Sequence, residues 1–162
     1  MKKISYLLVL LFFLAITSNC SGYKPIFSAS NLEFDISDYS ISGDKDLGNQ
    51  IYTKLYNLSA STRKKSASNN FYVLINSSKD KQATSKNTAG KILGYRIRIS
   101  STITIKDLST GNDVLSENFT YSATYEVQSQ FSETVKLENR TIENLVNEVF
   151  QNLLIRLSEK LI

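Results

Sequence analysis

Residues 95–106, Tyr-Arg-Ile-Arg-Ile-Ser-Ser-Thr-Ile-Thr-Ile-Lys, alternate between apolar and polar side chains along almost their whole length. Tyr95 and the isoleucines share one side of this pattern, while Arg96, Arg98 and several hydroxyl groups share the other. A repeat of two residues is typical of a β-strand, whose successive side chains point to opposite faces. Because strands of parallel sheets are normally buried on both faces, the pattern predicts an antiparallel sheet with one face in water.

The flanking segments supply partners for this strand. Residues 107–112 are typical of a turn, and residues 115–127 again place large apolar side chains on one side, which predicts a long hairpin. Before the deciding segment, the apolar run at 71–75 predicts a buried strand. The polar stretches on either side of that run, 59–70 and 76–90, are expected to form loops.

A strand and a helix are predicted nearer the N-terminus. Residues 32–36 have strand spacing, which residues 39–41 continue after a bulge. Between Leu47 and Leu58, apolar residues recur every three or four positions, as on one face of a helix. Asp44 or Asp46 suits its first turn, where a carboxylate meets free amides and the positive end of the dipole.

The last predicted element is a helix over residues 142–161. Its apolar residues recur at spacings of three and four: Ile142, Leu145, Val146, Val149, Phe150, Leu153, Leu154, Leu157 and Leu161. We expect this stripe to pack on the sheet. The alternative, a helix lying on a membrane surface, is disfavoured because glutamates balance Arg156 and Lys160, so anionic lipid gains little.

These elements predict an α+β fold with the order strand, helix, three strands, helix. Two helices on one face of a four-stranded, mostly antiparallel sheet would form a two-layer sandwich that buries every apolar face. Residues 32–162 are long enough for one such domain. The pattern leaves open whether the first strand lies at the sheet edge or beside the third.

The N-terminus has the features of a secretory signal. Lys2 and Lys3 precede an apolar stretch at 4–16 that is shorter than the roughly 20 residues needed to span a bilayer. Residues 1–19 are therefore predicted to be a lipoprotein signal peptide, with N-acyl and S-diacylglycerol chains such as palmitate on Cys20.

The alternative for this segment is an ordinary signal peptide. Thr17 and Asn19 depart from the usual residues of a lipoprotein cleavage box, but a lone cysteine in an oxidising compartment has no disulfide partner. Ser21 occupies the place where an aspartate would retain a lipoprotein in the inner membrane, which favours the outer membrane. Residues 20–31 are expected to be an extended, lipidated leader, because Pro25 opposes a helix.

Composition excludes several classes of site. The chain has no histidine and one cysteine, so Ser-His-Asp and Cys-His triads are excluded, as are the usual zinc and haem ligand sets. We therefore expect no enzyme, no metal and no cofactor other than the lipid on Cys20. The net charge of +4 falls once the signal lysines are removed, which does not favour nucleic acid.

The mature sequence resembles one family, the lipopolysaccharide-assembly lipoproteins (LptE) that partner the outer-membrane translocon barrel LptD. Residues 20–27, Cys-Ser-Gly-Tyr-Lys-Pro-Ile-Phe, are similar to the Cys-Gly-aromatic-Arg-Pro-Leu-Tyr start of alphaproteobacterial members, with Ser21 inserted. The polar loop ending at Gly90, residues 94–97 (Gly-Tyr-Arg-Ile) and residues 123–131 also fit the family, as does the terminal helix.

The resemblance implies a function and partners. Members plug the lumen of an LptD-type β-barrel, help it to fold and bind lipopolysaccharide on its way to the outer leaflet. The protein would be lipid-anchored on the periplasmic side of the outer membrane. Basic residues are the expected ligand contacts: Lys86, Lys91, Arg96 and Lys136. Two alternatives stay open: another envelope lipoprotein, serving as an accessory subunit of a lipid transporter, and an enzyme with clustered carboxylates.

Overall fold

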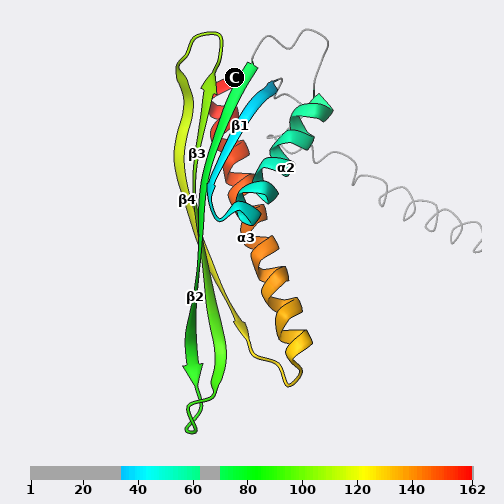
Figure 1. Ribbon diagram of the computed structural model, residues 1–162, viewed down its shortest axis with the longest axis vertical. Coiled ribbons are helices and arrows are strands. Elements are labelled where there is room, and N and C mark those ends of the chain that lie inside the picture. Colours follow the sequence, from blue (N-terminus) through cyan, green and yellow to red (C-terminus); the bar gives the residue numbers. More distant parts are fainter. Residues whose placement is uncertain (1–33, 63–69, 162) are drawn as a thin grey trace, which may run out of the picture.

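The computed structural model describes residues 34–62 and 70–161 (Figure 1). Its elements are β1 (Asp35–Gly43), α2 (Lys45–Thr62), β2 (Asn70–Lys86), β3 (Ile92–Asp107), β4 (Asp113–Glu126) and α3 (Phe131–Leu161). Both helices cover the same face of a four-stranded sheet, which confirms the predicted α+β sandwich (Figure 1). The signal peptide, the leader with Cys20, and residues 63–69 lie outside the described residues.

The strands follow the order β1-β2-β3-β4. Both hairpins, β2–β3 and β3–β4, are antiparallel, whereas β1 runs parallel to β2 at the sheet edge. This arrangement answers the question of where the first strand lies. The predicted bulge is present between Ile36 and Asp38.

The core lies between the sheet and the helices. Four isoleucines of β3 (Ile97, Ile99, Ile103 and Ile105) are buried together with a row of apolar residues of α3: Leu145, Val146, Val149, Leu153 and Leu157. Arg96, Arg98 and Thr102 are exposed on the opposite face, which no element of the described chain covers. The alternation in residues 95–106 thus has the predicted physical cause.

The turn between β1 and α2 is tied closely to β2. Gly43 adopts a positive φ of 74°, and the amide N–H of Asp44 donates a hydrogen bond of 2.6 Å to the carbonyl oxygen of Ser77. The carboxylate of Asp44 accepts a hydrogen bond of 3.1 Å from the N–H of Leu47. Asp44, one of the two residues predicted to suit the first turn of this helix, therefore caps α2.

The prediction of a loop over residues 76–90 is wrong for most of that stretch. β2 continues to Lys86 and stays paired with β3, and only residues 87–91 turn. The side chain of Asn87 closes this turn by accepting hydrogen bonds from the N–H groups of Ala89 and Lys91. Polar side chains on both faces hid the strand, because its stability comes from backbone pairing.

The terminal helix also begins earlier than expected, at Phe131 instead of near Ile142. Lys136 therefore lies on α3 and not in the connection before it. In the first turns of α3, Glu138 points toward the sheet and Thr134 toward the connection after β4, so polar residues take places that an apolar stripe would occupy. No helix in the described residues has an apolar stretch long enough to cross a membrane.

Candidate functional site

The candidate site lies along the β2–β3 hairpin, beyond the last buried residue of β2. On β2, the buried face ends at Ser77, whose hydroxyl pairs with that of Ser101 at 2.9 Å. Farther along the same face, Lys79 and Lys81 stand beside Ile99 and Ile97 of β3. The hairpin and the first turns of α3 lie at the same end of the molecule, away from α2 (Figure 1).

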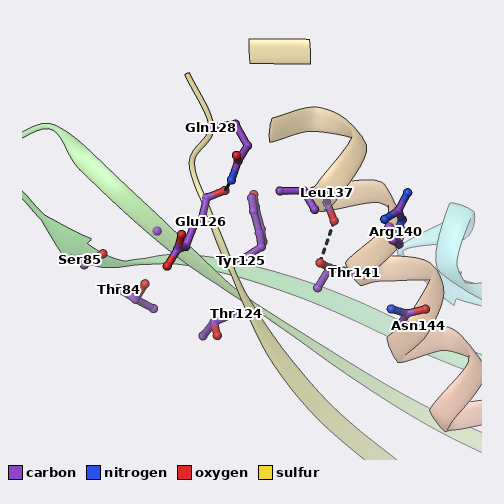
Figure 2. Close-up of a pocket in the computed structure, with 11 residues that line it drawn as sticks. Thr84, Ser85, Thr124, Tyr125, Glu126, Gln128, Leu137, Arg140, Thr141 and Asn144 are labelled. Atoms are coloured by element: carbon purple, nitrogen blue, oxygen red, sulfur yellow. Dashed lines mark hydrogen bonds between the residues drawn. The ribbon is translucent and has the colours of Figure 1, made fainter. Parts of the chain in front are cut away.

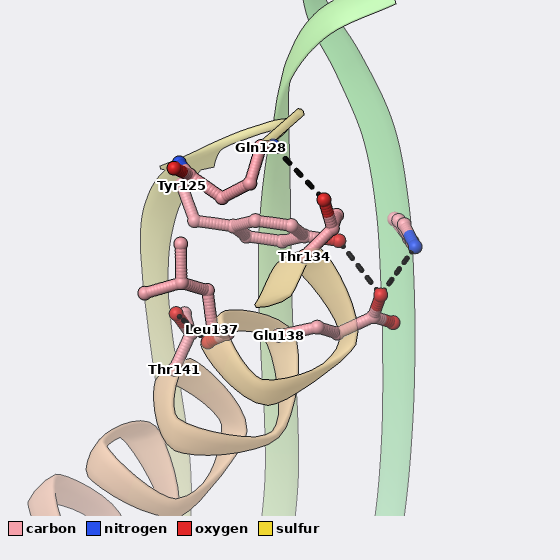
Figure 3. Close-up of polar contacts among 7 residues, drawn as sticks. Tyr125, Gln128, Thr134, Leu137, Glu138 and Thr141 are labelled. Atoms are coloured by element: carbon pink, nitrogen blue, oxygen red, sulfur yellow. Dashed lines mark hydrogen bonds and ion pairs between the residues drawn. The ribbon is translucent and has the colours of Figure 1, made fainter. Parts of the chain in front are cut away.

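A polar cluster joins the three elements at this end. The Lys81 ammonium lies 2.6 Å from Oε2 of Glu138, and the Tyr125 hydroxyl donates to the same oxygen at 2.8 Å (Figure 3). Lys81 also lies 4.4 Å from the centroid of the Tyr95 ring and 5.7 Å from that of Tyr125. One carboxylate on α3 thus connects β2 and β4.

The cluster perturbs the proton affinity of its members. Burial by itself would raise the pKa of Glu138, but the hydrogen bonds and charge of Lys81 and Tyr125 hold that pKa below its ordinary value. Burial would lower the pKa of Lys81, yet its contacts with Glu138 and Tyr125 raise it. The pKa of Tyr125 is raised, chiefly by burial. Lys81 and Glu138 are therefore a charged pair at neutral pH.

A cleft of about 580 Å³ opens on one side of the cluster, between the hairpin turn and the start of α3. We call it the basic cleft. Lys81 and Lys91 contribute its positive charges, and Ile92, Val127 and Phe131 contribute apolar surface. Phe131 is 83% exposed, an unusual state for a large apolar side chain. The basic cleft therefore combines groups suited to an anion with groups suited to a hydrocarbon chain.

A second pocket of about 670 Å³ has Tyr125 in its wall (Figure 2). It is lined by Thr84 and Ser85 of β2, by residues 124–126 of β4, and by Arg140 and other residues of α3. Its walls are largely polar, in contrast to the mixed walls of the basic cleft. Gln128 lines both, and its N–H donates a hydrogen bond of 2.9 Å to the Thr134 hydroxyl (Figure 3).

The basic residues expected from the sequence are distributed around this end. Lys91 lines the basic cleft, and Lys86 lies at the end of β2 close to the turn. Arg96 lies on the uncovered face of the sheet. Lys136 is exposed on α3 and pairs with Glu133 at 2.8 Å. Cys20 lies outside the described residues.

Sequence reasoning gave Glu138, Tyr125 and Phe131 no role in a binding site. It placed Lys81 among the lysines around the expected loop, where basic groups would suit anionic phosphates, but did not select it as a ligand contact. Lys81 and Glu138 are separated by 57 positions in the chain, so no local spacing connects them. Within residues 34–62 and 70–161, no group of three or more His, Cys, Asp or Glu side chains is placed to hold a metal ion.

The fold is shared with bacterial lipoproteins. An uncharacterized lipoprotein B from Nitrosomonas europaea superposes with a TM-score of 0.56 at 14% identity, over 82% of this chain and 88% of that one. A minor lipoprotein from Acinetobacter baumannii gives 0.52 at 16% identity, over 75% and 90%. A Caulobacter crescentus protein gives 0.53 at 15% identity, over 75% and 88%. No family model and no curated protein matches the sequence.

Proposed function

We propose that this protein is a lipid-anchored lipoprotein of the bacterial outer membrane that binds lipopolysaccharide in the basic cleft and plugs the LPS-translocon β-barrel. Its fold, shared with bacterial lipoproteins, supports the envelope role, as does the signal-like segment over residues 1–19, directly before Cys20. In this proposal, the protein acts by binding and not by catalysis.

The observation that carries the proposal is the composition of the basic cleft. Lipopolysaccharide presents phosphate groups beside acyl chains. The ammonium groups of Lys81 and Lys91 suit the phosphates through charge-assisted hydrogen bonds, and Phe131 with its apolar neighbours suits a chain. Lys86 at the same tip would add a third positive charge.

The uncovered face of the sheet supports contact with a barrel lumen. The hydroxyls of Ser100 and Thr120 lie 3.0 Å apart across β3 and β4, and those of Thr104 and Ser116 also lie 3.0 Å apart. Arg96 is exposed on the same face. Large outer-membrane barrels have polar interiors, which suit a face of hydroxyl and guanidinium groups.

The partner is tested by purifying the tagged full-length protein from detergent-extracted outer membranes and identifying its companions by mass spectrometry. The proposal predicts recovery of a large outer-membrane barrel in equal amount. Recovery of transporter subunits without a barrel would favour the second candidate, an accessory subunit of a lipid transporter. The mass of the N-terminal peptide tests the anchor, since acylated Cys20 would carry two or three chains.

The ligand is tested by comparing two lysines. We expect K91E to weaken binding of lipopolysaccharide by about tenfold, because a favourable charged contact becomes a repulsive one. K106E makes the same change of charge at the opposite end of β3, outside the basic cleft, and serves as the matched control. Equal losses in both variants would show that net charge, and not the cleft, determines binding.

A further inference from the structure

Lys81 faces the basic cleft with its charge already paired. Its ammonium contacts a carboxylate of α3 at 2.6 Å, although both side chains line the cleft and keep part of their surface in water, 37% for Lys81 and 24% for Glu138. An ammonium group has three donors, so one bond to Glu138 leaves others for a ligand. Within the basic cleft, the ammonium group of Lys81 is thus already bound to a carboxylate of the protein itself.

We propose that Glu138 is a built-in competitor for Lys81, and that a phosphate monoester entering the basic cleft displaces it. This inference rests on the proposed function, in which the cleft takes an anionic amphiphile. It goes further by naming the ion pair that the ligand must exchange and the kind of anion that can exchange it.

The charges decide which anions exchange. A phosphate monoester carries about −1.5 to −2 at neutral pH and has three acceptor oxygens. A ligand carboxylate carries the same charge as Glu138 and must also be brought from solution, so it gains little by replacing a group that is already in place. The pair therefore selects phosphate over carboxylate.

The surroundings allow the exchange without moving Lys81. The Tyr95 ring lies 4.4 Å from the ammonium, and this contact does not depend on which anion faces Lys81. Glu138 keeps a donor after the exchange, because the Tyr125 hydroxyl bonds to the same carboxylate. Lys79 is a further positive charge that lowers the pKa of Glu138 and supports its ionised form.

The chain offers a matched control on the same helix. Lys136 and Glu133 form an ion pair at 2.8 Å, three residues apart on α3 and exposed to solvent. Neither residue lines the basic cleft. E133Q therefore removes one carboxylate of α3, as E138Q does, without freeing a lysine in the cleft.

The experiment measures binding of hexyl phosphate and hexanoate to the mature lipoprotein in nanodiscs of zwitterionic lipid, by calorimetry with empty nanodiscs as blank. The unmodified protein should bind hexyl phosphate more tightly than hexanoate. E138Q should bind hexyl phosphate several-fold more tightly and lose part of the preference, and K81Q should bind it about tenfold more weakly. E133Q should match the unmodified protein.

The opposite signs of E138Q and K81Q separate competition from a scaffold. If the pair only holds the cleft together, both variants weaken binding, and the inference is wrong. The inference is also wrong if E138Q and the unmodified protein bind hexyl phosphate with the same affinity. In that case the proposed function still stands, because the unmodified protein binds the phosphate. If neither the unmodified protein nor E138Q binds hexyl phosphate, the cleft's role fails as well. Circular dichroism of each variant shows whether it is folded.

Discussion

Replacing Gly43 with alanine tests the tight junction between the β1–α2 turn and β2. Gly43 has a φ of 74°, and a Cβ built there would lie 2.1 Å from the carbonyl oxygen of Ser77 and 2.9 Å from the side-chain oxygen of Asn76. Gly111, in the β3–β4 turn, has nearly the same φ of 73° but open space around its Cβ position. The two substitutions therefore share the backbone strain and differ in the steric conflict.

The expected losses follow from these distances. An alanine at positive φ costs about 1–2 kcal/mol, part of which is offset by about 0.4–1 kcal/mol from the less flexible unfolded chain, so G111A should lose about 1 kcal/mol. G43A must in addition move β1 from β2 by roughly 1 Å and weaken the bond between Asp44 and Ser77, which adds about 2–3 kcal/mol.

The assay is equilibrium urea unfolding followed by far-ultraviolet circular dichroism, with both variants measured beside the unmodified protein. G43A should be less stable than G111A by about 2 kcal/mol or more, and amide exchange in β1 should accelerate in G43A. Equal stabilities would refute the close approach of the turn to Ser77. The parallel pairing of β1 with β2 would then be in doubt.

Three further results are expected. L153A should lose about 2–5 kcal/mol of unfolding free energy in urea, because Leu153 is fully buried, whereas I155A on the exposed side of α3 should lose less than half as much. The pKa of Glu138 is lowered in the folded protein, so this residue stabilises the fold fully above its ordinary pKa of 4.5, and the stabilisation is lost as pH falls through the lower folded value. Amide exchange in the first turns of α3, corrected for intrinsic rates, should therefore show weaker protection below pH 4.5 than above it. K136Q should change the thermal midpoint little, since the exposed pair with Glu133 contributes about 0–1 kcal/mol.

The elements that sequence reasoning placed well are those whose stability comes from side-chain burial. The alternation in residues 95–106 matched β3 because one face meets the helices and the other meets water. The helix after Asp44 was recognisable from its cap and its apolar stripe. In both cases a local pattern records a contact with the core.

The elements that it missed depend on other forces. The end of β2 beyond Ser77 is exposed on both faces and is held by backbone pairing to β3, which leaves no periodic signal. At the start of α3, Glu138 contacts β2 and β4, and Thr134 contacts the connection after β4. The polar character of these two inward-facing residues hides the helix. The parallel place of β1 also has no local signature, because strand order depends on contacts between distant segments.

The candidate site could be predicted only in part from the sequence, for the same reason. Lys91 could be proposed from the family that the sequence resembles, and it does line the basic cleft. The pair of Lys81 and Glu138 exists only because the hairpin and α3 meet, 57 positions apart. Phe131 looked like part of a connection, and its exposure became visible only once α3 was seen to begin there.

The tip of the β2–β3 hairpin gives this fold an adjustable reach. From Ser78 to Lys86, β2 extends about 30 Å beyond the last buried position of that strand. Inserting two residues at the end of β2 and two at the start of β3, next to the turn at 87–91, would lengthen this arm while leaving the pairing of β3 with β4, and with it the buried Ile97 and Ile99, in register. Related chains can therefore fit partners of different depth by changing the length of one hairpin, with the domain beneath it unaltered.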